Sequence, residues 1–222
     1  MHELVIFDCD GVLVDSEIIS NGVLAQMLTR EGLPTTLHDA RRDYQGLLLA
    51  DVLTRAEAKL GRPLSTSWLA EFEDERARAF HRELKPVPGA ADTVQRVIAA
   101  GIKVCVASQG KLAKTQLTLG LTGLRDLFSP DALFSAESVA RPKPDPALFQ
   151  HAAASMNATP SACAVIEDTA SGVTAAVAAG MRAIGYAADS DEHALKNAGA
   201  EITHSLHQLP QLLGIPSPNT VD

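Results

Sequence analysis

Short apolar runs alternate with segments of helical periodicity along most of the chain. Apolar runs rich in β-branched residues predict strands at 4–7, 102–107, 164–166 and 182–186. Apolar residues spaced by three or four predict helices at 90–100, 111–119, 147–156 and 171–179, of which three are expected to end at Gly101, Gly120 and Gly180. Strands that alternate with helices in this way are typical of an α/β protein with a Rossmann-like, doubly wound parallel sheet.

One long stretch, 16–85, shows helical patterns and no strand pattern. Its periodicity predicts helices at 18–30, 47–60 and 68–84, and the proline-rich turn 86–89 marks the return to alternation. We therefore expect two domains, a catalytic core made of 1–15 and 86–222 and an inserted small all-helical cap made of 16–85. The insert follows the first predicted strand, so we expect it to cover the carboxyl edge of the sheet, where ligands bind in such folds.

Polar side chains suited to catalysis stand directly after the predicted strands or in the proline-rich loop 141–146. These are Asp8, Asp10, Ser108, Lys143, Glu167 and Asp168. The carboxyl ends of parallel strands meet at one edge of a sheet, so residues that are distant in sequence are expected to share one pocket.

The chemistry of such a pocket follows from its charges. Several carboxylates in a small volume are stable only if some are protonated or a cation lies among them, and oxygen ligands without His or Cys favour Mg²⁺. Lys143 and the hydroxyl of Ser108 could then bind the oxygens of a phosphate. One carboxylate could attack phosphorus, and a second could protonate the leaving group and then activate water. Asp8 and Asp10 suit these tasks because residues i and i+2 of an extended segment face the same way, and Gly11 permits a sharp turn.

Composition excludes several other classes of protein. The formal net charge of −8 argues against a broad basic surface for nucleic acid. No run approaches 18 apolar residues, and the N-terminal segment lacks the basic region of a signal peptide. We therefore expect a cytoplasmic protein that acts on a small phosphorylated metabolite, with no nucleic-acid or membrane partner.

Cys9, Cys105 and Cys163 lack metal-binding spacing and lie in or beside apolar runs, which predicts buried thiols.

Four motifs, in this order, carry a resemblance to a known family: D-C-D-G-V-L-V-D-S-E, V-A-S-Q-G, R-P-K-P-D-P-A-L-F and V-I-E-D-T-A-S-G-V-T-A-A-V-A-A-G-M. The chain resembles the haloacid dehalogenase superfamily, and the helical insert after the first motif is similar to that of its β-phosphoglucomutase-like branch. Within that branch, K-P-D-P-A-L-F-Q-H-A-A and H-S-L-H-Q-L-P-Q-L resemble bacterial sugar-phosphate phosphatases of the 6-phosphogluconate phosphatase type.

The resemblance implies roles for the acidic residues. Asp8 matches the nucleophile and a metal ligand, and Asp10 matches the general acid/base whose backbone carbonyl also binds the metal. Glu167 and Asp168 match the acidic metal-binding pair. The metal implied for this set of oxygen ligands is Mg²⁺.

The resemblance also implies which residues bind phosphate. Ser108 matches the phosphate-binding hydroxyl and Lys143 the phosphate-binding lysine. Gln109 stands where relatives usually have Asn and is a further candidate for this group. Arg141 fits the lysine position in a second register of the proline-rich loop, but Lys143 leaves the A-L-F helix start at the family's usual distance.

The implied function is a Mg²⁺-dependent phosphatase that hydrolyses a small sugar or sugar-acid phosphate through an aspartyl phosphate, with 6-phosphogluconate as a candidate. Two alternatives stay open, a β-phosphoglucomutase-type hexose-phosphate mutase and a receiver-like phospho-aspartate switch. The mutase pattern has Lys, Gly and Arg in the cap, where this chain has Gln45, Gly46 and Leu49. It also has a His shortly after the two aspartates of the first motif, where this chain has Ser20. This difference favours hydrolysis, and Gln45 and Gly46 are the cap residues expected to face the substrate. A receiver-like switch would need neither a cap nor Asp10.

Overall fold

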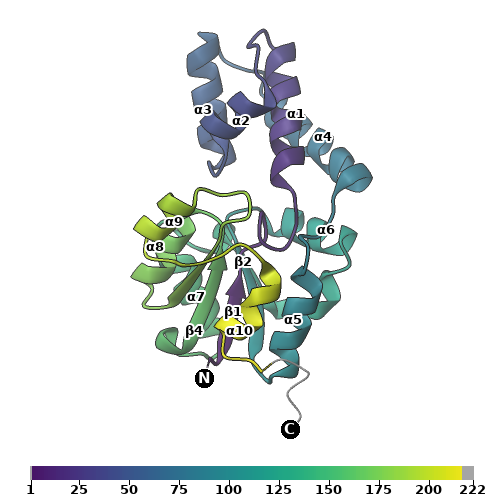
Figure 1. Ribbon diagram of the computed structural model, residues 1–222. Helices are drawn as coiled ribbons and strands as arrows, with labels where there is room; N and C mark the ends of the chain where they lie inside the picture. The colour runs from purple at the N-terminus through teal and green to yellow at the C-terminus, as the bar shows by residue number, and fades with distance from the viewer. Residues whose placement is uncertain (1, 217–222) are drawn as a thin grey trace. The chain divides into compact units, whose positions relative to one another are not determined.

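A six-stranded parallel sheet with the strand order β3-β2-β1-β4-β5-β6 forms the centre of the computed structural model, which describes residues 2–216 (Figure 1). Its strands are β1 (Leu4–Phe7), β2 (Lys103–Ser108), β3 (Leu133–Ser135), β4 (Cys163–Glu167), β5 (Arg182–Tyr186) and β6 (Glu201–Thr203). The order reverses direction beside β1, as in a doubly wound sheet. The predicted fold class is therefore confirmed.

Strand β1 is central and buried on both faces, which explains why its sequence is a continuous apolar run instead of an alternating one. Phe7 pairs in register with Val106 of β2 and with Ile166 of β4. The residues that follow Phe7 and Ile166 are Asp8 and Glu167, and the backbone N–H of Asp8 donates to the carbonyl of Ile166 at 2.9 Å. The register thus aligns the acidic residues at the carboxyl edge of the sheet.

Helices cover both faces of this sheet (Figure 1). One face carries α5 (Ala90–Ala99), α6 (Leu112–Leu121) and α10 (Leu209–Leu212), and the other carries α7 (Ala147–Ser155), α8 (Ala170–Ala178) and α9 (Glu192–Asn197). The sequence therefore predicted four of these helices to within one or two residues at each end. The short α9 and α10 were not predicted.

Two further details differ from the sequence prediction. The predicted end of α6 at Gly120 is wrong, because the helix continues to Leu121 and Gly123 is the residue that adopts the left-handed conformation, at φ +72°. The edge strands β3 and β6 were not predicted. Each has only three residues, which is too short for an apolar run to stand out.

The chain divides into two compact units, one made of Met1–Val14 and Pro86–Asp222 and the other of Asp15–Lys85. The boundaries predicted from sequence fell after residues 15 and 85. The second unit contains α1 (Glu17–Arg30), α2 (Leu37–Tyr44), α3 (Leu49–Leu60) and α4 (Trp68–Glu83). Helix α2 was not predicted, although a capping box marks its start: Thr36 Oγ1 accepts from the N–H of Asp39, and Asp39 Oδ2 accepts from the N–H of Thr36.

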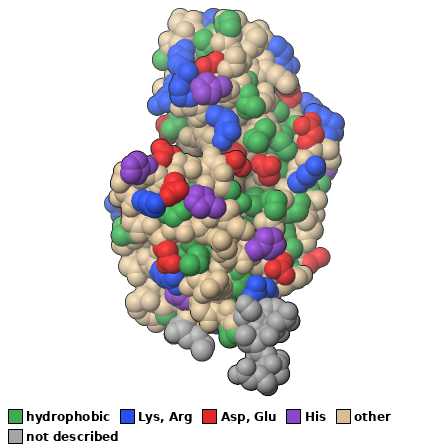
Figure 2. Space-filling model, viewed as in Figure 1, with side chains coloured by type: hydrophobic (Ala, Val, Ile, Leu, Met, Phe, Trp, Pro, Cys, Tyr) green, Lys and Arg blue, Asp and Glu red, His purple; other side chains and the backbone are tan. Residues whose placement is uncertain are grey.

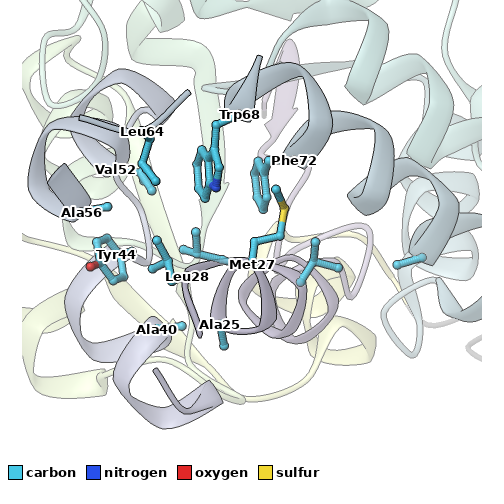
Figure 3. Packing of buried hydrophobic residues seen from close by; sticks show 13 residues of the cluster. Ala25, Met27, Leu28, Ala40, Tyr44, Val52, Ala56, Leu64, Trp68 and Phe72 are labelled. Carbon is cyan, nitrogen blue, oxygen red and sulfur yellow. The ribbon is translucent and has the colours of Figure 1, made fainter. Parts of the chain in front are cut away.

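The helical unit has a hydrophobic core of its own (Figure 3). The rings of Trp68 and Phe72 on α4 stack with a centroid distance of 5.9 Å, and Met27 and Leu28 of α1 lie beside them. Such a core allows the insert to fold as a compact body.

The surface and the buried thiols agree with the composition. On the face drawn in Figure 2, Lys and Arg side chains lie among Asp and Glu side chains. Within residues 2–216, every helix is too short or too polar to cross a membrane. Cys9, Cys105 and Cys163 are buried free thiols, as predicted.

Candidate active site

The loop after β1 folds back on itself through three short backbone hydrogen bonds. The carbonyl of Cys9 accepts from the N–H groups of Leu13 (2.9 Å) and Val14 (3.0 Å), and the N–H of Gly11 donates to the carbonyl of Val14 at 2.9 Å. Gly11 has a φ of +75°, and a Cβ at this position would overlap the carboxylate of Asp168. Gly11 is therefore required twice, for its backbone conformation and for the close approach of Asp168.

Lys143 is the centre of the buried charge network. Its ammonium group donates to Asp8 Oδ1 at 2.6 Å, to Glu167 Oε1 at 2.6 Å and to the carbonyl of Ala107 at 3.0 Å, so three acceptors match its three donors. The ammonium also lies 4.8 Å from the ring centroid of Phe149. The side chain is 1% exposed. Of the two cations predicted for this loop, Lys143 is therefore the one beside Asp8.

Arg141, the alternative cation, lies at the surface. Its side chain is 76% exposed and pairs with Asp145 at 3.0 Å. The carboxylate of Asp145 also accepts from the N–H of Ala147, the first residue of α7. The proline-rich loop thus turns one cation inward and the other toward solvent.

The pKa values of Asp8 and Lys143 reflect their burial together. Burial raises the pKa of Asp8 to about 7, Lys143 opposes this rise, and repulsion from Glu167 and Asp10 adds to it. Burial lowers the pKa of Lys143, but Asp8 and Glu167 raise it by more, so the pKa lies above its ordinary value. The lysine is therefore charged at every physiological pH, whereas Asp8 depends on its surroundings for its carboxylate form.

Glu167 uses its carboxylate to hold the network together. Besides the bond from Lys143, its Oε2 accepts from the N–H of Asp168 (3.1 Å), the N–H of Thr169 (3.0 Å) and Thr169 Oγ1 (2.8 Å). A Cβ on Gly172 would overlap this carboxylate. Packing therefore requires glycine at position 172, in the first turn of α8. Four donors leave Glu167 better suited to positioning Lys143 than to binding a metal.

Ser108 and Gln109 lie at the end of β2, beside the network. Ser108 is buried and its Oγ accepts from the N–H of Gly110 at 3.1 Å, which leaves its hydroxyl proton for another acceptor. Gln109 Oε1 accepts from the backbone N–H of Lys143 at 2.9 Å. Its carboxamide oxygen therefore fixes the lysine loop, a contact that the sequence did not indicate.

A second lysine, Lys114, contacts Asp10 and was missed by the sequence prediction. Its ammonium group forms an ion pair with Asp10 Oδ1, and the two side chains are 13% and 21% exposed. Lys114 is in the first turn of α6. A cation in the first turn of a helix is unfavourable because it opposes the helix dipole. This unfavourable position is the sequence feature that could have identified Lys114.

The oxygen atoms near Asp8 fit a magnesium ion. The carboxylates of Asp8 and Asp168 and the main-chain carbonyl of Asp10 are hard ligands, and Asp168 lies against Gly11, the residue after Asp10. Within residues 2–216, no three side chains of His, Cys, Asp and Glu gather as a metal site. Mg²⁺ usually takes only one or two carboxylates and completes its shell with waters and phosphate oxygens.

Gln45 and Gly46 belong to the helical unit, where they form the turn after α2. The N–H of Leu47 donates to the carbonyl of Tyr44 at 3.2 Å across this turn, and Gly46 has a φ of +77°, as a type II turn requires. Arg41 Nε donates to Gln45 Oε1 at 3.2 Å and orients the amide.

Known proteins resemble this chain over most of its length. The family model described as haloacid dehalogenase-like hydrolase matches residues 2–180. The chain is 31% identical to 6-phosphogluconate phosphatase of Escherichia coli K12, over 95% of this chain and 94% of that protein. It is 32% identical to hexitol phosphatase B of the same strain, over 81% of each chain. A haloacid dehalogenase-like protein of Agrobacterium tumefaciens, 31% identical, superimposes with a TM-score of 0.82 over 96% of this chain and 98% of that one.

Proposed function

The chain belongs to the haloacid dehalogenase-like hydrolases and is a phosphatase, and we propose that it hydrolyses a small sugar or sugar-acid phosphate through an aspartyl phosphate on Asp8, with Mg²⁺. The observation that carries the proposal is the 2.6 Å contact between the Lys143 ammonium and Asp8 Oδ1. A buried cation that touches a buried carboxylate at a sheet edge can bind the anionic phosphate beside the group that attacks it.

In the first half-reaction, a carboxylate oxygen of Asp8 attacks phosphorus and the bond from phosphorus to the ester oxygen breaks. Asp10, in its protonated form, gives its proton to the departing oxygen, so the alcohol leaves neutral. The Lys143 donor that contacts Asp8 in the free protein turns to a non-bridging oxygen as Asp8 attacks, and the hydroxyl of Ser108 binds another.

In the second half-reaction, water attacks the phosphorus of the aspartyl phosphate and restores the Asp8 carboxylate. The carboxylate form of Asp10 takes a proton from that water. One residue therefore serves as acid and then as base, and the protein returns to its starting protonation state.

Mg²⁺, held by Asp8, Asp168 and the Asp10 carbonyl, would offset the negative charge of the phosphate and of the clustered acids. The acidic groups themselves support this part of the proposal. Burial of Asp8 beside Glu167 raises its pKa to about 7, and a bound divalent cation favours the carboxylate form that attacks phosphorus.

The relatives support the substrate class. One is named for 6-phosphogluconate and another for hexitol phosphates, which are both phosphate esters of open-chain sugar derivatives. We propose 6-phosphogluconate as the first substrate to test. We further propose that Gln45 and Gly46 contribute to substrate choice, on the basis of the family resemblance and of the fixed orientation that Arg41 gives Gln45.

The decisive experiment measures inorganic phosphate released from 6-phosphogluconate, hexitol phosphates and glucose phosphates, with Mg²⁺ and with EDTA. We expect Mg²⁺-dependent release that the Asp8→Asn substitution abolishes. Conversion of β-glucose 1-phosphate to glucose 6-phosphate, without phosphate release from any ester, would support the mutase instead.

A further inference from the structure

Lys114 reaches the Asp10 carboxylate from a helix that the rest of the core fixes in place. At the start of α6, Glu137 Oε2 accepts from the N–H of Leu112 at 2.9 Å. Ser135 Oγ donates to the carbonyl of Gly110 at 2.8 Å, just before the helix. Both bonds join the start of α6, the helix that carries Lys114, to residues at and just after the end of strand β3.

The same helix also contacts the segment that carries the two aspartates. Thr118, one turn beyond Lys114, is fully buried, and its Oγ1 lies 3.6 Å from Cys9 Sγ. The hydroxyl also donates to the carbonyl of Lys114 at 3.1 Å. Cys9 stands between Asp8 and Asp10. Thr118 therefore links the backbone of Lys114 to the segment that carries Asp10, the partner of the Lys114 side chain.

The space around this pair is also restricted. A Cβ on Gly110 would lie 3.4 Å from Lys114 Cδ, 3.4 Å from Ser108 Oγ and 3.8 Å from Asp10 Oδ2. The lysine stem, the phosphate-binding hydroxyl and the carboxylate of Asp10 therefore converge on one glycine. The ammonium and the carboxylate are both mostly removed from solvent, which strengthens their attraction over that of a surface pair.

We propose that Lys114 is a positioning residue that aims the carboxylate of Asp10 at the ester oxygen of the substrate. The inference rests on the proposed function and adds a residue to it. When Asp10 gives its proton to the departing oxygen, the resulting carboxylate is held and stabilised by the Lys114 ammonium. The same contact keeps that carboxylate in place to accept the proton of the attacking water.

This role differs from that of Lys143. Lys143 touches Asp8 and Glu167, on the side of the nucleophile, and its loss would affect every substrate alike. Lys114 acts through Asp10, on the side of the leaving group. Its loss should therefore affect esters in proportion to their need for a proton on the departing oxygen.

The test compares two esters that differ in this need. p-Nitrophenyl phosphate has a leaving group that departs without a proton, whereas the best alkyl phosphate of the panel described above requires one. For Lys114→Met we expect kcat/KM to fall by about 30-fold or more for the alkyl ester, but by about threefold or less for the aryl ester. Lys114→Arg, which keeps the charge, should recover part of the loss. The inhibition constant of inorganic phosphate and the melting temperature should stay close to those of the unsubstituted protein.

The control is Lys196→Met, which removes a lysine from an exposed ion pair with Glu192 on α9. This substitution should leave kcat/KM for both esters unchanged. Equal losses of kcat/KM for the two esters would overturn the inference. Weaker inhibition by phosphate would then indicate that Lys114 binds phosphate. A lower melting temperature would instead indicate a structural role. If the unsubstituted protein hydrolysed neither ester, the proposed function itself would fail, and the inference with it.

Discussion

The ammonium group of Lys143 lies 2.6 Å from Asp8 Oδ1, and neither side chain is more than 10% exposed. The lysine pairs equally closely with Glu167, so two buried carboxylates share one cation, which balances the charge of only one of them. Burying such a network costs desolvation free energy that the hydrogen bonds only partly offset, and removal of one partner leaves the others uncompensated. The network is therefore a sensitive point for both stability and catalysis.

Replacing Lys143 with Met should destabilise the protein and inactivate it. The buried carboxyl groups of Asp8 and Glu167 would lose the cation that compensates their charge, which costs about 3–5 kcal/mol of unfolding free energy. Phosphate release should fall by about 10²–10³-fold or more because the phosphate loses its buried donor. Urea unfolding and steady-state kinetics measure the two effects. Arg141→Met is the matched control, since Arg141 is 76% exposed, and it should change the unfolding free energy by less than about 1 kcal/mol. Full activity of Lys143→Met would contradict the assignment.

Replacing Gly172 with Ala should disturb Glu167 and, through it, Lys143. The new methyl group would overlap the Glu167 carboxylate, so the carboxylate must move or the helix must shift, at a cost of about 1–3 kcal/mol. Activity should fall together with stability because Lys143 loses one of its three acceptors. Differential scanning calorimetry and phosphate release measure both.

Gly120→Ala provides the comparison for that substitution. Gly120 lies in α6, and a Cβ there would have no heavy atom within 4 Å. Alanine should therefore stabilise the protein by about 0.5–1 kcal/mol through helix propensity alone. A similar gain from Gly172→Ala would show that the close approach at Glu167 is not maintained in solution.

The sequence could predict the edge of the sheet where the site lies, but not the role of each residue within the site. Asp8, Ser108 and Glu167 were identifiable because each ends an apolar run, and parallel strands bring such ends together. Lys114 was not, because it lies six residues beyond Ser108 and reaches Asp10 only once α6 packs against Cys9.

The direction of individual side chains was also beyond the sequence. The inward turn of Glu167 depends on donors from Thr169 and on the missing side chain of Gly172. The contact between Gln109 and the backbone of Lys143 joins positions 34 residues apart. Neither contact follows from a pattern of spacing. The first depends on the conformation of the turn between β4 and α8, and the second forms only when two separate loops pack together.

The two neighbouring acids of the fourth motif should respond differently to loss of charge. Asp168→Asn should raise the Mg²⁺ concentration for half-maximal activity by about tenfold or more, because a metal ligand is weakened. Glu167→Gln should lower the melting temperature while leaving that concentration within about threefold, because Glu167 holds Lys143 and the Asp168 backbone. Mg²⁺ titrations of activity, with a melting curve for each variant, separate the roles. A larger metal defect in Glu167→Gln would reverse the assignment.

The stability of the protein without divalent cations should depend on pH through Asp8. Burial raises the folded-state pKa of Asp8 from 3.8 to about 7, so between these values the folded protein holds a proton that the unfolded chain has released. This group's contribution to stability is therefore complete below about pH 4 and is lost as the pH rises through about 7, with a size of a few kcal/mol. Asp8→Asn cannot ionise and lacks this loss. Urea unfolding in EDTA at pH 5, 6, 7 and 8 should thus show Asp8→Asn gaining stability relative to the unsubstituted protein as the pH rises. Saturating Mg²⁺ should reduce that gain, because a cation beside Asp8 stabilises the carboxylate. A difference that stays constant from pH 5 to 8 would contradict the raised pKa.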